Sequence, residues 1–193
     1  MNILITTALN PILDAVAACY AYWKLRLFFH EQATIGIAGK EDLETQWLLK
    51  ELKIADVIRL ENTNEGFDVF IVWNAVRDGV SFALPQTILP HRVIEIIDRG
   101  RKDQNDYSPF PKAIVRIEPV TFSTMATEQY QARRLAIDPI STQFLYCAIY
   151  IATNNLDPER TTPRDRAALR YLQTQFNVPL TLVRDLFIAT QPR

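Results

Sequence analysis

The first half of the chain alternates between short apolar runs and longer segments with helical periodicity, and this alternation limits the possible folds more than any other feature. Two segments with apolar residues at helical spacing, Leu13–Phe29 and Glu41–Ile54, separate the first three apolar runs. Strands that alternate with helices are typical of a mostly parallel sheet. The expected strands are Asn2–Thr7, Ala33–Ala38, Asp56–Leu60, Asp68–Val72 and Arg92–Ile97.

These observations predict an α/β domain with a mostly parallel sheet of about five strands and helices on both faces. The run Phe67–Trp73 is apolar throughout, so it predicts a central strand rather than an exposed edge. A sixth strand is expected within Ala113–Val120. After Val120 the pattern becomes helical, which predicts a helical C-terminal half of the same domain. The expected helices are Phe122–Ala136, Ile140–Ile151, one that begins at Thr162 and Pro163, and Leu180–Ala189.

Composition excludes several classes of function. The chain has 193 residues, 48% of them apolar, and a formal net charge of −1, so no broad basic surface for nucleic acid is implied. The two cysteines, Cys19 and Cys147, lie in apolar helix-like runs and are expected to be reduced core thiols. The sequence opens without a basic leader and has no apolar run of membrane length. We therefore expect a cytoplasmic protein with no membrane association.

The stretch ALNPILDAVAA, Ala8–Ala18, follows the first expected strand and begins a helix. Such strand-to-helix junctions are favoured ligand sites in α/β proteins. Here, however, Asn10 and Asp14 are its only polar side chains. The junction therefore has the position of a binding site without the donors that a site needs.

Several segments, in the right order, resemble the DHH phosphoesterase superfamily, which includes RecJ-type exonucleases, oligoribonucleases and manganese-dependent inorganic pyrophosphatases. RVIEIIDRG resembles the strand that ends in Asp-His-His in that family, and ALNPILDA resembles its opening His-x-Asn-Pro-Asp-x-Asp-Ala pattern. IVRIEPVTFSTMAT and TTPRDRAALRYL match two connecting segments. The resemblance covers the whole chain, so it implies a single DHH-like domain over residues 1–193. No length remains for the C-terminal substrate-binding domain of many members.

The resemblance also implies where metal ligands would stand, and most are replaced. Members bind divalent cations, usually manganese, through carboxylate and imidazole groups that activate a water molecule. Only Asp14 and Asp98 keep a ligand type here, because the remaining matching positions are Ala8, Ile12, Trp73, Arg99, Gly100 and Ala152. We therefore predict a vestigial pocket, without catalytic or metal-binding residues, formed by Asn10, Asp14, Trp73, Asp98, Arg99 and Ala152.

Two functions are weighed on this basis. The first is a degenerate, catalytically inactive domain that acts as a binding or structural component and needs no cofactor. Its expected partner is another protein chain or a second copy; a phosphate-containing ligand at Arg99, Arg101 and Arg116, or nucleic acid, is also considered. The second is a metal-dependent nuclease, oligonucleotide hydrolase or pyrophosphate hydrolase with a rearranged site. In that case Asp14, Asp98, Glu95 or Glu118 would recruit manganese.

Three structural expectations follow. Asp14 and Asp98 should lie near each other, because both strand ends open onto the same side of the fold. Arg99, or failing it Arg101 or Arg116, should pair with one of these carboxylates in place of a metal. Trp73 should fill part of the space, while Trp73, Phe82 and Phe110 are candidates for an open apolar face that contacts a partner.

Overall fold

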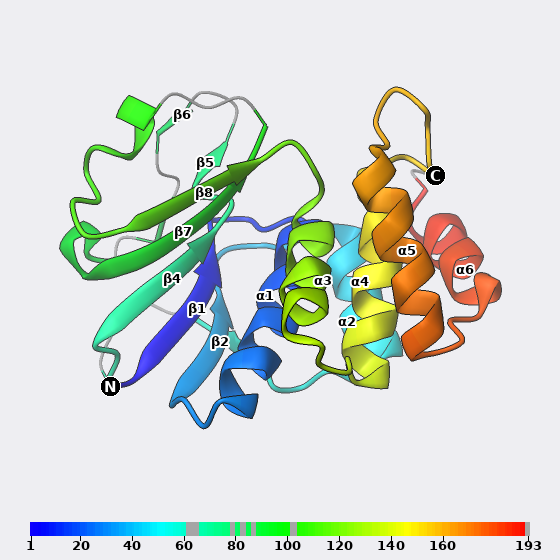
Figure 1. Cartoon of the computed structure of the whole chain (residues 1–193), viewed down its shortest axis with the longest axis horizontal. Coiled ribbons are helices and arrows are strands. Elements are labelled where there is room, and N and C mark those ends of the chain that lie inside the picture. The colour runs from blue at the N-terminus through cyan, green and yellow to red at the C-terminus, as the bar shows by residue number, and fades with distance from the viewer. Residues whose placement is uncertain (61–65, 78–79, 82–83, 86–87, 101–103, 192–193) are drawn as a thin grey trace.

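Six parallel strands form the central sheet of the computed structural model, which describes residues 1–60, 66–77, 80–81, 84–85, 88–100 and 104–191 (Figure 1). Every neighbouring pair of strands in the sheet is parallel. The central position predicted for Phe67–Trp73 is confirmed, since β4 lies between β1 and β7. The order across the sheet is β3 (Ile58–Arg59), β2 (Ala33–Ile37), β1 (Ile3–Thr7), β4 (Val69–Trp73), β7 (Val93–Arg99) and β8 (Ile114–Glu118).

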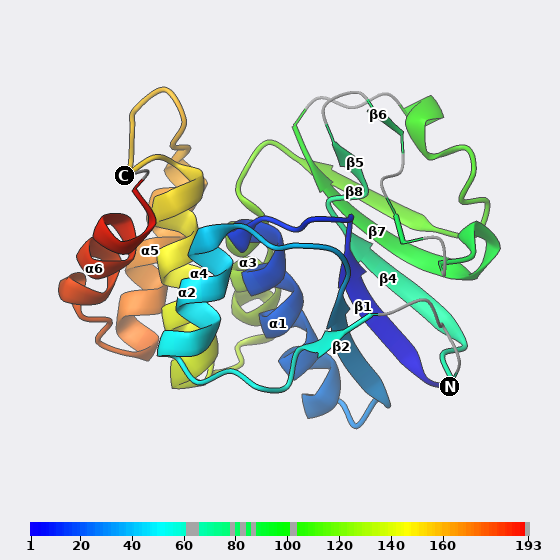
Figure 2. The ribbon, with the colours of Figure 1, turned by 180° about the vertical axis from the view of Figure 1, so that it is seen from behind.

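The α-helices gather on one face of this sheet, as the two opposite views show (Figures 1 and 2). Strand residues Ile5, Ile71 and Ile97 point into this helical layer and share one buried cluster with it. Helix α1 lies at the centre, packed against the sheet, α3 and α4. The helices are α1 (Leu13–Phe28), α2 (Leu43–Glu51), α3 (Phe122–Arg133), α4 (Pro139–Ala152), α5 (Pro163–Gln175) and α6 (Leu180–Thr190).

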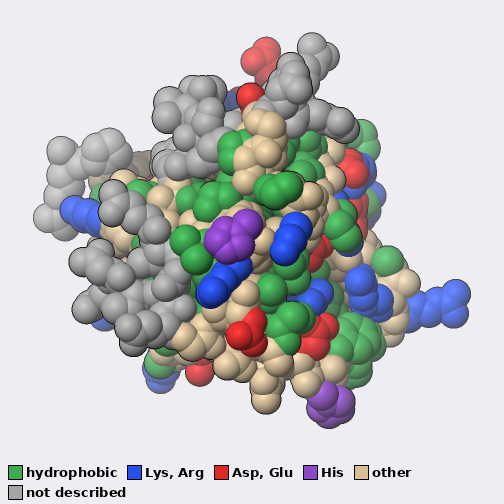
Figure 3. Space-filling model, turned by 90° about the vertical axis from the view of Figure 1, so that its left-hand side faces the viewer, with side chains coloured by type: hydrophobic (Ala, Val, Ile, Leu, Met, Phe, Trp, Pro, Cys, Tyr) green, Lys and Arg blue, Asp and Glu red, His purple; other side chains and the backbone are tan. Residues whose placement is uncertain are grey.

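The opposite face carries loops and 3₁₀ turns instead of α-helices. Leu4, Phe70 and Ile96 point to this side and pack with Tyr107 and Phe110 in a second buried cluster. Figure 3 looks onto this side, where apolar and basic side chains are interspersed. Its described elements include the antiparallel pair β5 (Val76–Arg77) and β6 (Val80–Ser81), and the 3₁₀ helices η1 (Pro90–Arg92) and η2 (Gln104–Tyr107).

The prediction of a mostly parallel α/β sheet with a helical C-terminal part is confirmed, but the helices are distributed differently from the expectation. Right-handed crossovers place the β1–β2 and β2–β3 connections on one face and the β4–β7 and β7–β8 connections on the other. The latter connections contain Pro85, Pro90, Pro109 and Pro111. Proline removes a backbone donor and restricts the preceding residue, so these segments form turns rather than α-helices.

Capping residues fix where the C-terminal helices begin. The predicted start of α5 is confirmed: the Thr162 hydroxyl accepts a hydrogen bond from Asp165 N, the Asp165 carboxylate accepts one from Thr162 N, and Pro163 follows the cap. Thr121 caps α3 through Thr124 N, and Asp138 caps α4. These local bonds satisfy the first amide groups of each helix, which lack partners within the helix itself.

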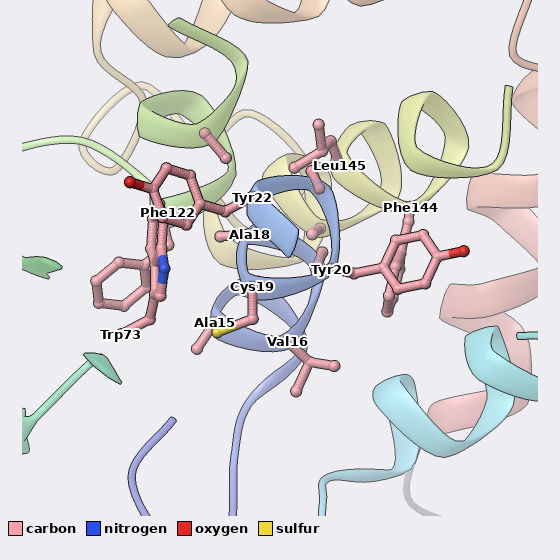
Figure 4. Packing of buried hydrophobic residues seen from close by; sticks show 14 of the residues in the cluster. Ala15, Val16, Ala18, Cys19, Tyr20, Tyr22, Trp73, Phe122, Phe144 and Leu145 are labelled. Carbon is pink, nitrogen blue, oxygen red and sulfur yellow. The ribbon is translucent and has the colours of Figure 1, made fainter. Parts of the chain in front are cut away.

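Helix α1 is buried on nearly all sides, and small side chains allow its close approach to neighbours. Ala15, Ala17 and Ala18 are fully buried in it (Figure 4). Cys19 and Cys147 are free and buried, and burial raises the pKa of the Cys147 thiol to about 12. Within the described residues, no helix is both long enough and apolar enough to span a membrane.

Candidate functional site

The residues that the sequence singles out gather where β1, β4 and β7 end. Thr7 of β1 pairs in register with Trp73 of β4, and Trp73 pairs with Ile97 of β7, so the three strands end side by side. Helix α1 begins just beyond β1 and α3 begins just beyond β8. We call Asp14, Trp73, Asp98 and Arg99, the residues brought to these ends, the strand-end cluster.

Asp14 joins helix α1 to the N-terminus of α3. Its carboxylate accepts hydrogen bonds from Phe122 N and Ser123 N, each at 2.9 Å, and its side chain is buried. The first amide groups of a helix carry partial positive charge and attract an anion. The Asp14 carboxylate therefore occupies the anion-binding position at the N-terminus of α3, and each of its oxygens accepts an amide hydrogen bond from that helix.

Arg99 supplies the charge opposite Asp14. Its Nη1 lies 3.2 Å from Asp14 Oδ2, so the expected ion pair is present, and the guanidinium lies over the Phe122 ring at 5.3 Å from its centroid. Burial is the largest influence on Asp14 and raises the pKa of this carboxyl, against the opposing effects of Arg99 and the two amide donors. The Arg99 side chain is 38% exposed, so solvent screens part of the attraction.

Trp73 fills the space between Tyr22 of α1 and Phe122 of α3 (Figure 4). Its ring meets both edge-on, with centroids 5.5 Å from Tyr22 and 6.2 Å from Phe122. Trp73 is 1% exposed, and its indole Nε1 has no hydrogen-bond partner among the described residues. The aromatic side chain thus occupies the end of the central strand as packing.

Asp98 serves the opposite face of the sheet. Ile97 joins the helical core and Ile96 joins the second cluster, because successive strand side chains point to opposite faces. Asp98 accepts a hydrogen bond from Tyr107 Oη of that second cluster at 3.1 Å and one from Arg99 N at 2.8 Å. Asp14 and Asp98 therefore have separate sets of donors, Asp14 at the start of α3 and Asp98 at Tyr107 and Arg99 N.

Asn10 holds two neighbouring turns together. It adopts a left-handed backbone conformation, with φ of 54°, which asparagine tolerates better than most residues. Its backbone N–H donates to Ala38 O at 3.1 Å, and its Oδ1 accepts from Lys40 N at 2.8 Å. A side chain on Gly39 would collide with Asn10, so this contact requires glycine.

The remaining predicted positions differ in burial and in their partners. Ala8 is buried, Ala152 is half-buried at the end of α4, and Gly100 is exposed with φ of 85°. Arg116 pairs with Glu95 at 3.3 Å rather than joining Arg99, and Arg101 lies outside the described residues. Of the three arginines proposed for anion binding, both described ones already face a carboxylate of this chain.

The candidates for an open apolar face are also corrected. Trp73 and Phe110 are 1% and 3% exposed, so neither offers a surface to a partner. Each packs into a core cluster instead. Phe82 lies outside the described residues.

Asp165 is a structural residue whose full role the sequence motif did not reveal. It is fully buried and accepts hydrogen bonds from Thr124 Oγ1 at 2.7 Å and from Thr121 N at 3.1 Å, as well as from its own capping partner Thr162. Burial raises its pKa, but these donors together outweigh burial and lower the pKa below the usual aspartate value. Asp14 and Asp165 thus both accept hydrogen bonds from backbone amides at the start of α3.

The donor set of the cluster does not fit a divalent cation. Metal sites of this type need several oxygen or nitrogen donors converging on one point. Here the Asp14 oxygens are held by amides, a guanidinium stands beside them, and Asp98 faces the other side of the sheet. In the parts of the chain that the structure describes, no three His, Cys, Asp or Glu side chains converge as metal ligands would.

Comparison of the structure with solved structures supports the resemblance in fold. A Methanococcus jannaschii protein assigned as a family II inorganic pyrophosphatase superposes with a TM-score of 0.71 at 17% identity, over 97% of this chain and 61% of the other. An exopolyphosphatase-related protein from Bacteroides fragilis gives a TM-score of 0.71 at 12% identity, over 100% of this chain and 57% of the other.

The chain has the fold of the DHH phosphoesterases. The predicted resemblance is therefore confirmed at the level of fold. No protein-family model and no curated protein matches the sequence significantly. The chain spans about three-fifths of the length of the two DHH structures, and identities this low carry no information about substrate or activity.

Proposed function

We propose that this chain is a degenerate DHH-like domain without phosphoesterase activity, which acts as a binding or structural component. The observation that carries the proposal is the state of Asp14, one of the two positions that keep a ligand type. Its oxygens accept two amide hydrogen bonds from α3 and face Arg99. A cation at this point would have to displace the helix terminus and lie beside a permanent positive charge.

The neighbouring positions support the same proposal. Trp73 occupies the end of the central strand with a side chain that cannot bind a cation, and it is packed on two sides by aromatic rings. Arg99 stands where the family has an imidazole ligand. The cluster therefore fastens α1 and α3 to the sheet, and we derive no hydrolytic step from it.

The proposal assigns the chain's work to a protein surface in the cytoplasm. A phosphate-containing ligand at the strand ends is less favoured, because Arg99 and Arg116 already pair with Asp14 and Glu95. A protein partner could instead bind elsewhere on the surface, without unpaired arginines at the strand ends. This assignment draws on the geometry of the cluster and on the resemblance in fold.

A manganese titration by calorimetry, followed by hydrolysis assays on pyrophosphate, a dinucleotide and a short oligonucleotide, tests the proposal. A family II inorganic pyrophosphatase serves as the positive control for metal and assay. We expect no saturable heat and no hydrolysis above buffer. Micromolar manganese binding accompanied by turnover would overturn the proposal in favour of a metal-dependent phosphoesterase with a rearranged site.

A partial restoration of the family motif sharpens this test. The double variant Arg99→His/Gly100→His recreates the Asp-His-His sequence at the end of β7. We expect no activity from it, because Trp73 still fills the neighbouring strand end and the Asp14 oxygens remain bound to α3. Measurable hydrolysis by this variant would show that the loss of two histidines alone explains the inactivity.

A further inference from the structure

The outer side of α4 is the floor of a groove whose walls are α5 and α6. One depression of about 360 Å³ lies between α4 and α5, and another of about 440 Å³ lies between α4 and α6. Tyr150 of α4 lines both, so the two depressions lie on either side of one side chain. We call this surface the α4–α6 groove; Figure 1 shows these three helices at the end of the helical layer farthest from the sheet.

Each wall helix turns one face toward the groove. On α5 the lining residues are Arg166, Leu169, Arg170 and Gln173, which follow the i, i+3, i+4, i+7 spacing of one helix face. On α6 the lining residues follow the same spacing: Leu180, Val183, Arg184, Phe187, Ile188 and Gln191. A helix that packs only against its own domain needs one apolar stripe. On α6 the groove lining shares Val183 and Phe187 with that stripe and extends beyond it to Leu180 and Ile188.

Two apolar residues on the groove side of α6 are largely exposed to solvent. Leu180 and Ile188 have exposed fractions of 67% and 66%, and both lie on the groove side of α6. At the floor, Tyr146 and Tyr150 stack with ring centroids 5.1 Å apart, and burial raises the pKa of Tyr150 to about 12. Large apolar side chains grouped around aromatic anchors are typical of protein interfaces.

The charge of the groove has one sign. Its lining includes Arg166, Arg170 and Arg184 and no aspartate or glutamate. Arg184 pairs with the adjacent Asp185, whereas the structure gives Arg166 and Arg170 no ion pair among the described residues. Two exposed arginines beside an apolar floor favour an occupant that brings carboxylates to the rim.

A strained turn borders the groove at its open end. Asn154, Asn155 and Leu156 are three consecutive residues with positive φ, at 50°, 59° and 63°. Asparagine accepts this conformation, whereas for leucine it is unfavourable. The turn places Asn155 against the α6 depression and Leu156 against the α5 depression. Strain of this kind often accompanies a binding surface, and here it shapes both halves of the groove.

We propose that the α4–α6 groove binds an acidic amphipathic helix of another protein. The apolar side of such a helix would lie over Tyr150 and against Leu180 and Ile188, and its carboxylates would face Arg166 and Arg170. Helix-in-groove binding uses anchors at this same spacing. The inference does not depend on catalytic inactivity, since the groove shares no residue with the strand-end cluster.

A second copy of the chain is a poorer occupant on electrostatic grounds. A two-fold contact between two such grooves would place the same surface against itself. The arginines of one groove would then meet those of the other, and like charges brought together across an interface are unfavourable. The groove's charge therefore favours a different, acidic partner.

Selection from displayed peptide libraries tests the proposal directly. Three libraries of amphipathic helices share an apolar stripe randomised over Leu, Ile, Met, Phe and Trp, and differ only in a polar face built from Glu, Gln or Lys. Each is selected against the whole chain. We expect enrichment from the Glu library, and synthetic copies of the enriched peptides serve as probes in calorimetry.

Matched variants locate the binding. Arg166→Glu/Arg170→Glu should weaken the enriched peptides by about tenfold or more, because two favourable charge contacts become repulsive. Leu180→Asp/Ile188→Asp should weaken them by a similar factor through loss of apolar contact. The control Lys112→Glu/Arg133→Glu changes the same net charge at exposed sites outside the groove and should leave affinity unchanged. Circular dichroism confirms that each variant is folded.

Three outcomes would overturn the proposal. They are enrichment of the Lys library over the Glu library, enrichment of no library, and enriched peptides that bind the groove variants as tightly as the wild type. Light scattering adds an independent check: a dimer abolished by Leu180→Asp/Ile188→Asp would identify a second copy as the occupant instead. Loss of peptide binding would leave the manganese and hydrolysis results unaffected, so the two proposals fail separately.

Discussion

The strand-end cluster and the α4–α6 groove treat polar and apolar groups in opposite ways. At the strand ends the carboxylates of Asp14 and Asp98 are bound by donors of the same chain, and Trp73 is buried. In the groove Arg166 and Arg170 form no ion pair within the part of the chain that the structure describes, and large apolar side chains on α6 are exposed. The first region is internally complete, whereas the second has contacts left to make.

This difference shows how fold and function separate in this chain. The likeness in fold to DHH structures predicts a site at the strand ends. In this chain the strand-end cluster instead contacts α1 and α3 and holds them against the sheet. The surface that can still gain energy from an outside molecule lies elsewhere. Because the strand-end groups contact the chain itself and the groove groups are exposed, we expect substitutions at the strand ends to change stability and substitutions in the groove to change binding.

Trp73→Ala should give the largest loss of stability. Removing a fully buried indole leaves a cavity between Tyr22 and Phe122, which costs about 3–5 kcal/mol. Trp73→Phe should cost much less, because the lost Nε1–H makes no hydrogen bond and the aromatic packing is kept. Urea unfolding followed by fluorescence of the remaining tryptophans measures both. Equal losses in the two variants would contradict a packing role.

Asp165→Ala should follow, with a loss of about 3 kcal/mol. The substitution leaves buried donors of Thr121 and Thr124 without an acceptor and removes half of the α5 capping box. Asp185→Ala is the matched control, since its only described ion pair is with Arg184 on the surface. Chemical unfolding at neutral pH gives the comparison, and a control loss as large as that of Asp165→Ala would refute it.

The two carboxylates that grip α3 should respond to pH with opposite sign. The pKa of Asp165 is lowered in the folded chain, so its stabilisation is present above the unfolded value near 4 and is lost as pH falls through the folded value. The pKa of Asp14 is raised, so its contribution is full below the unfolded value and declines as pH rises through the folded value. The difference in unfolding free energy between wild type and Asp165→Asn should therefore grow as pH rises from 3 to 7, whereas the difference between wild type and Asp14→Asn should shrink. The prediction fails if both differences change with pH in the same direction.

Arg99→Ala should cost about 1 kcal/mol. The ion pair with Asp14 is partly screened, because more than a third of the Arg99 side chain is exposed, and the two amide donors to Asp14 remain. Arg99→Lys should recover part of the loss by restoring the charge without the planar contact on Phe122. Thermal unfolding of both variants decides the point. No recovery by lysine would assign the whole effect to the ring contact.

Groove substitutions should have the smallest effect on stability. Leu180→Ser and Ile188→Ser remove exposed side chains, so each should change the free energy of unfolding by less than about 0.5 kcal/mol. Leu186→Ser, on the buried face of the same helix, should cost several times more. If Leu180→Ser and Leu186→Ser destabilise equally, α6 has no separate outer face and the contrast between the two regions fails.

Much of the fold could be predicted from the sequence because its signals are local. The predicted strand Asp68–Val72 appears as β4 (Val69–Trp73) in the central position, and the cap at Thr162 lies where the Thr-Pro pair indicates. The α-helices expected on the second face could not be excluded, because the course of a proline-rich connection depends on what it covers. That face is closed by Tyr107 and Phe110 from a polar loop.

The site was harder to predict because its contacts join distant parts of the chain. The pairing of Arg99 with Asp14 follows from adjacent strand ends, but the hydrogen bond from Tyr107 to Asp98 depends on strand alternation and on a loop that the sequence does not place. Tyr107 and Ser123 carried no signal of their roles. The groove could not be predicted either, because the sequence pattern of Leu180 and Ile188 is that of an ordinary amphipathic helix.

The burial of α1 has a consequence for how the protein is made. Its partners α3 and α4 begin at Phe122 and Pro139, so the ribosome must add more than a hundred residues before they are available. At typical rates of synthesis this takes on the order of 10 s. Throughout that interval the sides of α1 that pack against α3 and α4 stay uncovered, even where β1 and β2 already contact the helix. Folding of the domain should therefore be completed only after its C-terminal half has emerged.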